Sequence, residues 1–198
     1  MLKKVVLFIL ACVVPVMFTG SNASAGIVGS DHDLSTLIPS LENICFVCHT
    51  PHKAKNIPDT PLSSRNAPTG PYTLYSSPTL NAVVEQPGGT DLLCLSCHDG
   101  TIALDTYQDN AGGTVFMPAD HIIGLSNSHP ISFNFINAAA LDPGIANPID
   151  ASGSGLAPFK LFNGYMRCAT CHDPHKGESP DFLRNASPTM CTVCHINK

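Results

Sequence analysis

One five-residue pattern occurs four times in the chain and constrains its fold more than any other feature. Each copy has two cysteines separated by two residues, followed at once by a histidine. The copies are Cys45-Phe46-Val47-Cys48-His49, Cys94-Leu95-Ser96-Cys97-His98, Cys168-Ala169-Thr170-Cys171-His172 and Cys191-Thr192-Val193-Cys194-His195. Eight of the nine cysteines belong to these copies, and the ninth, Cys12, lies in an apolar segment near the start. This regularity indicates that the cysteines share one chemical purpose.

The pattern is the attachment signature of c-type haem, in which two thiols form thioethers with the porphyrin and the histidine binds the iron. Two intervening residues make one turn, which aims both sulfurs at the same edge of the ring. Disulfides and zinc sites also use paired cysteines, but neither requires a histidine after every second cysteine. We therefore expect four covalent haem c groups. They would be attached at Cys45, Cys48, Cys94, Cys97, Cys168, Cys171, Cys191 and Cys194 and bound through His49, His98, His172 and His195.

A low-spin iron also needs a second axial ligand, and five histidines lie outside the motifs: His32, His52, His121, His129 and His175. His52 and His175 both follow a motif in the setting histidine, any residue, proline, histidine, lysine. Proline turns the chain away from a helix, so neither can reach the far face of the haem bound three residues earlier. Both must serve other haems, which predicts closely spaced haems.

The order of these ligands repeats along the chain. The first half has His32, a motif with a Pro-His tail and then a plain motif, and the second half has His129 followed by the same two types of motif. We therefore expect distal ligands at His32, His52, His129 and His175, with His121 as either a surface side chain or an alternative ligand. The expected organisation is a signal segment at 1–25 and dihaem modules at 26–115 and 116–198, packed as one tetrahaem domain.

The first 25 residues have the features of a signal peptide: Lys3 and Lys4, an apolar run at 5–18, and the small triplet Ala23-Ser24-Ala25. The apolar run is shorter than the roughly 20 residues of a spanning helix. We expect cleavage, export to the periplasm or the cell exterior, and no stable membrane span; a retained anchor is the alternative. Without this segment, 8 basic side chains stand against 15 acidic ones. This balance disfavours nucleic acid as a partner and favours a basic or mineral surface.

Prolines and glycines interrupt the chain throughout, and it has no tryptophan. These residues punctuate secondary structure, so the predicted fold class is mostly irregular coil with a few short α-helices and little β-structure, organised around a closely packed haem chain. A brief strand is expected over residues 131–136, where apolar and polar residues alternate. The large apolar haems would replace much of the missing core, so the apoprotein should be disordered.

The chain resembles the doubled-CxxCH family of multihaem cytochromes c. The resemblance rests on His32-Asp33-Leu34-Ser35, on residues 45–52 and 92–100, and on Ser128-His129-Pro130-Ile131. It implies an electron-transfer protein of bacterial anaerobic respiration. Some tetrahaem relatives are similar to the extracellular cytochromes that polymerise into filaments in metal-reducing bacteria. The family pattern also implies the distal ligands His32, His52, His129 and His175.

The first functional hypothesis is an electron conduit, not an enzyme, that serves redox partner proteins or an extracellular acceptor through its haems. The alternative is a multihaem reductase of a small nitrogen compound. Such an enzyme needs an iron with an open coordination position, whereas here spare histidines outnumber irons. A refinement of the first hypothesis is a head-to-tail homopolymer in which His32 ligates a haem of the neighbouring subunit. In the simpler arrangement, His32 folds back within its own chain.

Overall fold

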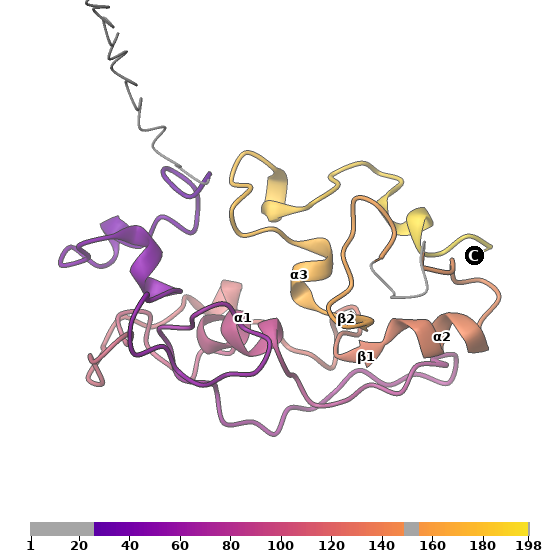
Figure 1. Ribbon diagram of the computed structural model, residues 1–198, viewed down its shortest axis with the longest axis horizontal. Helices are drawn as coiled ribbons and strands as arrows, with labels where there is room; N and C mark the ends of the chain where they lie inside the picture. The colour runs from indigo at the N-terminus through magenta and orange to yellow at the C-terminus, as the bar shows by residue number, and fades with distance from the viewer. Residues whose placement is uncertain (1–25, 149–154, 198) are drawn as a thin grey trace, which may run out of the picture.

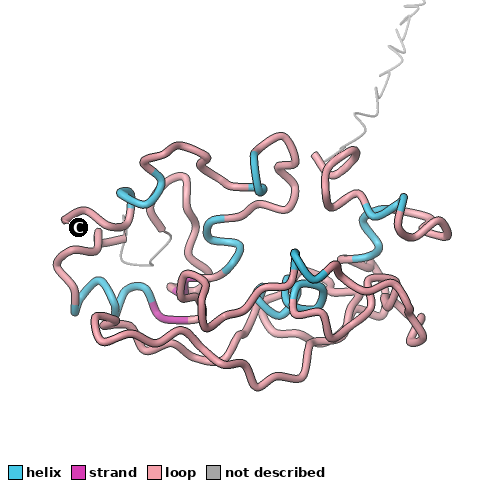
Figure 2. Tube along the Cα trace, turned by 180° about the vertical axis from the view of Figure 1, so that it is seen from behind, coloured by secondary structure: helices cyan, strands magenta, loops and turns pink. Residues whose placement is uncertain are grey.

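The computed structural model describes residues 26–148 and 155–197, so the predicted signal segment and Cys12 lie outside the described residues. Loops make up most of the described chain (Figure 2). The described helices and strands are α1 (Thr90–His98), α2 (Phe135–Leu141), α3 (Cys168–Cys171), β1 (Phe133–Asn134) and β2 (Tyr165–Met166), with the 3-10 helices η1 (Leu34–Thr36), η2 (Ile44–Val47), η3 (Ala119–His121), η4 (Pro180–Phe182) and η5 (Met190–Val193). The prediction of a mostly irregular fold with few short helices and little sheet is confirmed.

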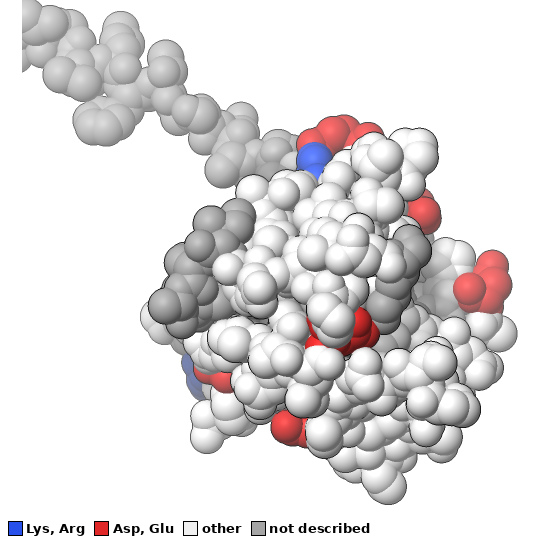
Figure 3. Space-filling view, turned by 90° about the vertical axis from the view of Figure 1, so that its right-hand side faces the viewer, with Lys and Arg blue, Asp and Glu red and all other residues white. Residues whose placement is uncertain are grey.

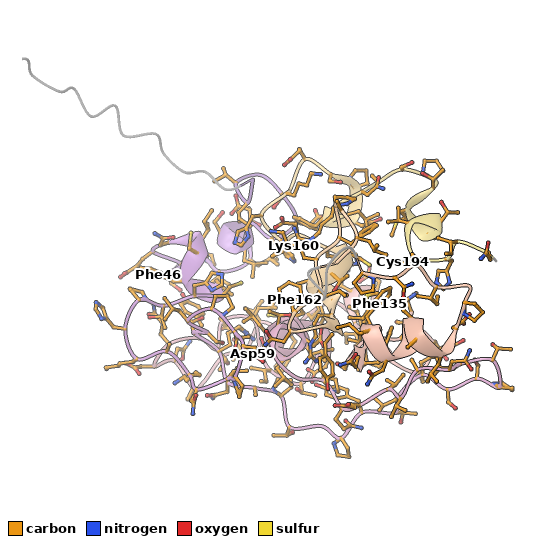
Figure 4. The ribbon with its side chains drawn as sticks, turned by 45° about the vertical axis from the view of Figure 1, so that its right-hand side comes forward. Phe46, Asp59, Phe135, Lys160, Phe162 and Cys194 are labelled. Atoms are coloured by element: carbon orange, nitrogen blue, oxygen red, sulfur yellow. The ribbon has the colours of Figure 1, made fainter. Side chains whose placement is uncertain are left out.

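Each of the four motifs lies on a short helix. η2 carries the first motif, α1 the second, α3 the third and η5 the fourth. In Figure 1 these helices follow one another along the long axis, from η2 at one end to η5 at the other. Figure 4 shows Phe46 of the first motif and Cys194 of the last motif at opposite ends of the molecule. The motifs therefore form a row in sequence order.

The strand expected over residues 131–136 is present only as the two residues of β1, which pairs antiparallel with β2. Helix α2 begins directly after β1 because the Asn134 side chain accepts a hydrogen bond from the backbone N–H of Asn137, at 3.0 Å. This contact is an N-cap. The buried side chains of α2 have helical spacing and are Phe135, Ala138 and Ala139. The prediction was wrong beyond Asn134 because the cap and this spacing favour a helix.

Two small clusters of buried apolar residues lie within the part of the chain that the structure describes. One contains Ile38, Val47 and Leu104, with Cys97 packed against it. The other contains Phe133, Phe135, Ala138, Ala139 and Met166, with Cys194 packed against it. Each cluster thus contacts a motif cysteine. So little buried apolar surface leaves room for bound haem to contribute to the core.

A buried polar contact joins the two halves of the chain. Asp91 of α1 has no exposed surface, and its carboxylate accepts hydrogen bonds from Ser132 Oγ at 2.6 Å, Arg167 Nη1 at 3.1 Å and the Cys168 backbone N–H at 2.7 Å. This network fixes α1 against the start of α3, so that the second and third motifs lie side by side.

On the end of the molecule that carries α2 and η5, acidic side chains lie in several separate places and basic ones are rare (Figure 3). The whole chain has a formal net charge of −5. Within the part of the chain that the structure describes, no helix is long and apolar enough to cross a membrane.

Candidate haem-binding sites

Three of the four motif histidines are oriented by backbone carbonyl groups. Their Nδ1 atoms lie at hydrogen-bond distance from carbonyl oxygens: His49 from Pro61 at 2.7 Å, His98 from His121 at 3.0 Å and His172 from Asp181 at 2.7 Å. An imidazole that donates from Nδ1 has the lone pair of Nε2 available for a metal. This is the orientation that an iron-binding histidine requires.

Three spare histidines lie opposite three motif histidines. The ring centroids of His32 and His98 are 6.2 Å apart, those of His49 and His175 are 6.1 Å apart, and those of His129 and His195 are 6.3 Å apart. Two imidazoles that bind one iron from opposite faces have ring centres about 6 Å apart, because each nitrogen lies about 2 Å from the metal. All three pairs therefore have the spacing for one iron.

The ring planes of these pairs make angles of 65°, 19° and 69°. Rotation of either ring about the axis through the two nitrogens changes this angle without moving the nitrogens, so all three values are compatible with one iron between the rings. The residues present thus fit a haem at the second, first and fourth motifs.

The remaining motif histidine, His172, has no ring contact with a residue that the structure describes. The same holds for His52, the fourth expected distal ligand. Both side chains are exposed. Within the described chain, the structure therefore leaves the third motif without a second imidazole.

A cavity of about 190 Å³ adjoins the fourth motif. His129 and His195 line it, together with the motif cysteines Cys191 and Cys194. Its other walls are mostly apolar and include Phe133, Phe135, Ala138, Ile145, Phe159 and Met166. A cavity that combines two thiols, two imidazoles and an apolar lining matches the chemical requirements of a covalently attached haem.

Successive motifs touch one another along the row. Val47 of the first motif and Cys97 of the second pack in the same apolar cluster. The thiol of Cys94 in the second motif is close enough to Cys168 of the third to raise the pKa of Cys168. Cys171 of the third motif lines the cavity of the fourth. Groups attached at these cysteines would be direct neighbours.

His32 is the most enclosed of the three spare histidines that face a motif. Burial and the adjacent His98 lower its pKa, and the nearby Pro174 carbonyl group only partly opposes this shift. Phe182 stacks on its ring with centroids 4.3 Å apart. A lowered pKa keeps the imidazole neutral, which is the form that binds iron.

His121 is placed at the surface, and its Nδ1 lies 3.0 Å from the Asp120 carboxylate. Its backbone carbonyl group, not its ring, contacts the motif histidine His98. The choice between a surface side chain and an alternative ligand stays a prediction for this residue.

The eight motif cysteines are all free of disulfide bonds, so their thiols are available for thioether formation. Among residues 26–148 and 155–197, no group of three or more histidine, cysteine or acidic side chains is arranged to hold a metal ion.

Several residues that build these sites were not found from the sequence. The carbonyl groups of Pro61 and Asp181 orient histidines, but a backbone carbonyl leaves no residue-type signal. Arg65 is 1% exposed and donates to Ser96 Oγ in the second motif, at 2.9 Å. The repeated tripeptide Arg-Asn-Ala at residues 65–67 and 184–186 is the one signal that would have drawn attention to it.

Residues 162–198, which carry the third and fourth motifs, match the family model described as doubled CXXCH motif. No curated protein matches the chain. The motifs imply covalently bound haem c, and the doubled arrangement indicates a c-type cytochrome that transfers electrons.

Proposed function

We propose that the exported chain binds four haem c groups, one per motif, and conducts electrons along the row in the periplasm or outside the cell. Each bound haem supplies a one-electron couple between ferric and ferrous iron. The three imidazole pairs with centroids 6.1–6.3 Å apart carry this proposal. Histidines on both faces of an iron leave no position for a substrate. The acceptor would be a redox protein or an extracellular surface, and not nucleic acid.

The test is the haem content of the purified chain, measured by intact mass and by the absorbance of its pyridine haemochrome. Four haems per chain are expected, and removal of Cys191 and Cys194 together should leave three. A chain that carries metal but no haem, or fewer than four haems when produced with full attachment machinery, would contradict the proposal.

We further propose that the chain assembles head to tail and that a neighbouring subunit supplies the second ligand at the third motif. His175, in the Pro-His tail of the third motif, faces His49 of the first motif within one chain. His52 has the same place in the tail of the first motif. Within one chain, the tail histidine of the second half faces the motif histidine of the first half. If the first half of a neighbouring subunit docks on the second half of this chain in the same way, its His52 faces His172.

This refinement moves the bridging role from His32 to His52, because His32 already lies opposite His98 of its own chain. A contact that joins different surfaces and does not close generates a filament. The exposure of both His52 and His172 supports an intermolecular pairing.

Substitution of His52 by alanine tests the refinement. Filaments seen by electron microscopy should disappear, while the haem content stays at four per chain. His121→Ala is the matched control because it removes another exposed histidine, and its filaments should persist. Filaments of the His52 variant would contradict this assignment.

The alternative is a reductase of a small nitrogen compound, and the observation that favours it is that His172 has no ring contact with a described residue. An enzyme of this kind requires one iron with an open position in the working assembly. The spin state of the assembled protein separates the two functions.

A further inference from the structure

We infer that Arg65 is a positioning and tuning residue whose buried charge makes the haems of the first half easier to reduce than those of the second. The inference rests on the proposed function, since it concerns groups attached at the first two motifs. It assigns a direction to the row: electrons collect at the end that carries η2 and α1.

The guanidinium of Arg65 is held by oxygen atoms that carry no charge. Nε donates to Ser96 Oγ at 2.9 Å, Nη1 donates to the Leu104 carbonyl group at 2.7 Å, and Nη2 donates to the carbonyl groups of Ser96 and Ala103 at 2.9 and 2.8 Å. All three nitrogens are therefore satisfied, which explains how the side chain tolerates burial.

No carboxylate of the described residues lies within ion-pair distance of Arg65. The carboxylate on which its charge acts is Asp105. That group accepts hydrogen bonds from the backbone N–H groups of Thr114 and Val115, at 3.1 and 2.9 Å. The positive charge of Arg65 is thus buried without a direct counter-charge.

Arg65 lies between the first and second motifs. Ser64, directly before it, donates from its backbone N–H to the Cys48 carbonyl group at 3.0 Å and from Oγ to the Val47 carbonyl group at 2.7 Å. The guanidinium contacts Ser96, between the two cysteines of the second motif. The charge therefore lies beside both attachment sites.

The corresponding arginine of the second half has its charge cancelled. Arg184 stands in the same Arg-Asn-Ala tripeptide, and its Nη1 lies 2.8 Å from Oδ2 of Asp173, which follows the third motif. In the first half the residue after the first motif is Thr50, which is neutral. Asp99 follows the second motif, and its carboxylate accepts hydrogen bonds from Tyr72 and Thr101. The remaining arginine, Arg167, is paired with Asp91.

A fixed cation in a region of low dielectric constant favours the electron-rich, ferrous form of a nearby iron over the ferric form. Arg65 acts in this way on the first half, whereas the ion pair of Arg184 has no net charge. With haem bound at all four motifs, Arg65 would therefore favour the ferrous state at the first two motifs in a partly reduced chain.

The experiment is a spectroelectrochemical titration of the holoprotein with Arg65→Gln, with haem content measured on the same sample. Loss of the charge should decrease the equilibrium constant for reduction of the first-half haems by about tenfold, which is 59 mV for one electron. Arg65→Lys keeps the charge and should restore most of the shift. Lys53→Gln removes a cation whose side chain is 79% exposed in the same half and should leave the titration unchanged.

The wild-type titration gives a second readout that does not depend on folding of a variant. Two haems should be reduced before the other two, and removal of Cys45 and Cys48 should delete one of the early components. The inference is overturned if Arg65→Gln keeps four haems and shifts no potential, as it would if a haem propionate neutralised the guanidinium, or if all four wild-type haems titrate together. A chain without haem would instead overturn the proposed function.

Discussion

The two halves of the chain hold their Pro-His motifs with the same backbone arrangement. In the first half Nδ1 of His49 lies 2.7 Å from the Pro61 carbonyl oxygen, and in the second half Nδ1 of His172 lies 2.7 Å from that of Asp181. The next residues, Leu62 and Phe182, both have positive φ angles, 48° and 55°. Proline and aspartate are chemically unlike, so the turn conformation, not the side chain, is what the two halves share.

The halves differ in what surrounds this arrangement. His49 faces His175 of the same chain, whereas His172 has no ring contact with a described residue. Arg65 is buried without a carboxylate at ion-pair distance, whereas Arg184 is paired with Asp173. The comparison shows that local backbone structure orients each motif histidine. Long-range contacts determine which second histidine faces it and which charged side chains lie near the haem site.

The largest effect is expected when haem attachment is prevented in both halves. Production of the chain without attachment machinery should give a protein with no cooperative thermal transition, because the two small apolar clusters bury too few side chains to offset the conformational entropy of the long loops. Circular dichroism and NMR dispersion measure this outcome. A cooperatively folded apoprotein would show that the polypeptide core is sufficient.

The connection between the halves should be the next most sensitive feature. Asp91→Ala leaves Arg167 buried without its partner and is expected to destabilise the holoprotein by about 3–5 kcal/mol, measured by denaturant unfolding. Asp109→Ala, which breaks the exposed ion pair with Lys53, should cause no measurable change. Equal effects of the two variants would show that Asp91 does not fix the halves together.

The predicted difference in reduction potential between the halves should become smaller when the ion pair of Arg184 in the second half is broken. Asp173→Asn releases the charge of Arg184 and should favour reduction at the third motif by a factor of about two to five, as expected for a partly exposed pair worth about 0.5–1 kcal/mol. Potentiometric titration should then show a narrower separation between early and late haems. A wider separation would contradict the comparison.

The smallest effect is expected at the contact between η4 and His32. Phe182→Leu removes the ring that stacks on this imidazole and should decrease stability by about 0.5 kcal/mol, the lower end of the range for an aromatic pair, without loss of haem. Phe116→Leu changes an aromatic side chain that is 55% exposed, and its unfolding curve should match that of the wild type. If the two variants have the same unfolding curve, stacking of Phe182 on His32 does not contribute to stability.

The sequence predicted the features that depend on local patterns. The irregular fold follows from the turn-forming residues, and the motif cysteines and histidines are recognised from their spacing. The assignment of the distal ligands stays a prediction. The helix α2 was missed although its signals are present in the sequence. Asn134 is a favourable N-cap, and the apolar residues Phe135, Ala138 and Ala139 follow it with helical spacing. The alternation of apolar and polar residues around Phe133 favoured a strand instead.

The ring pairs could not be predicted, because they depend on the path of long loops. His32 and His98 are 66 residues apart in the sequence, as are His129 and His195. This equal separation does not identify either pair until the structure shows one of them. The role of Arg65 was equally hidden, since its partners are backbone carbonyl groups distant in sequence. The division into modules at 26–115 and 116–198 stays a prediction.

The most direct test of the central claim is the electron paramagnetic resonance spectrum of the oxidised, assembled holoprotein, with spins quantified against haem. If the chain is an electron conduit, all four haems should be low-spin, and dissociation into single subunits should make one haem per chain high-spin. One high-spin haem per chain in the intact assembly would mean an open iron, and would contradict the conduit in favour of the reductase.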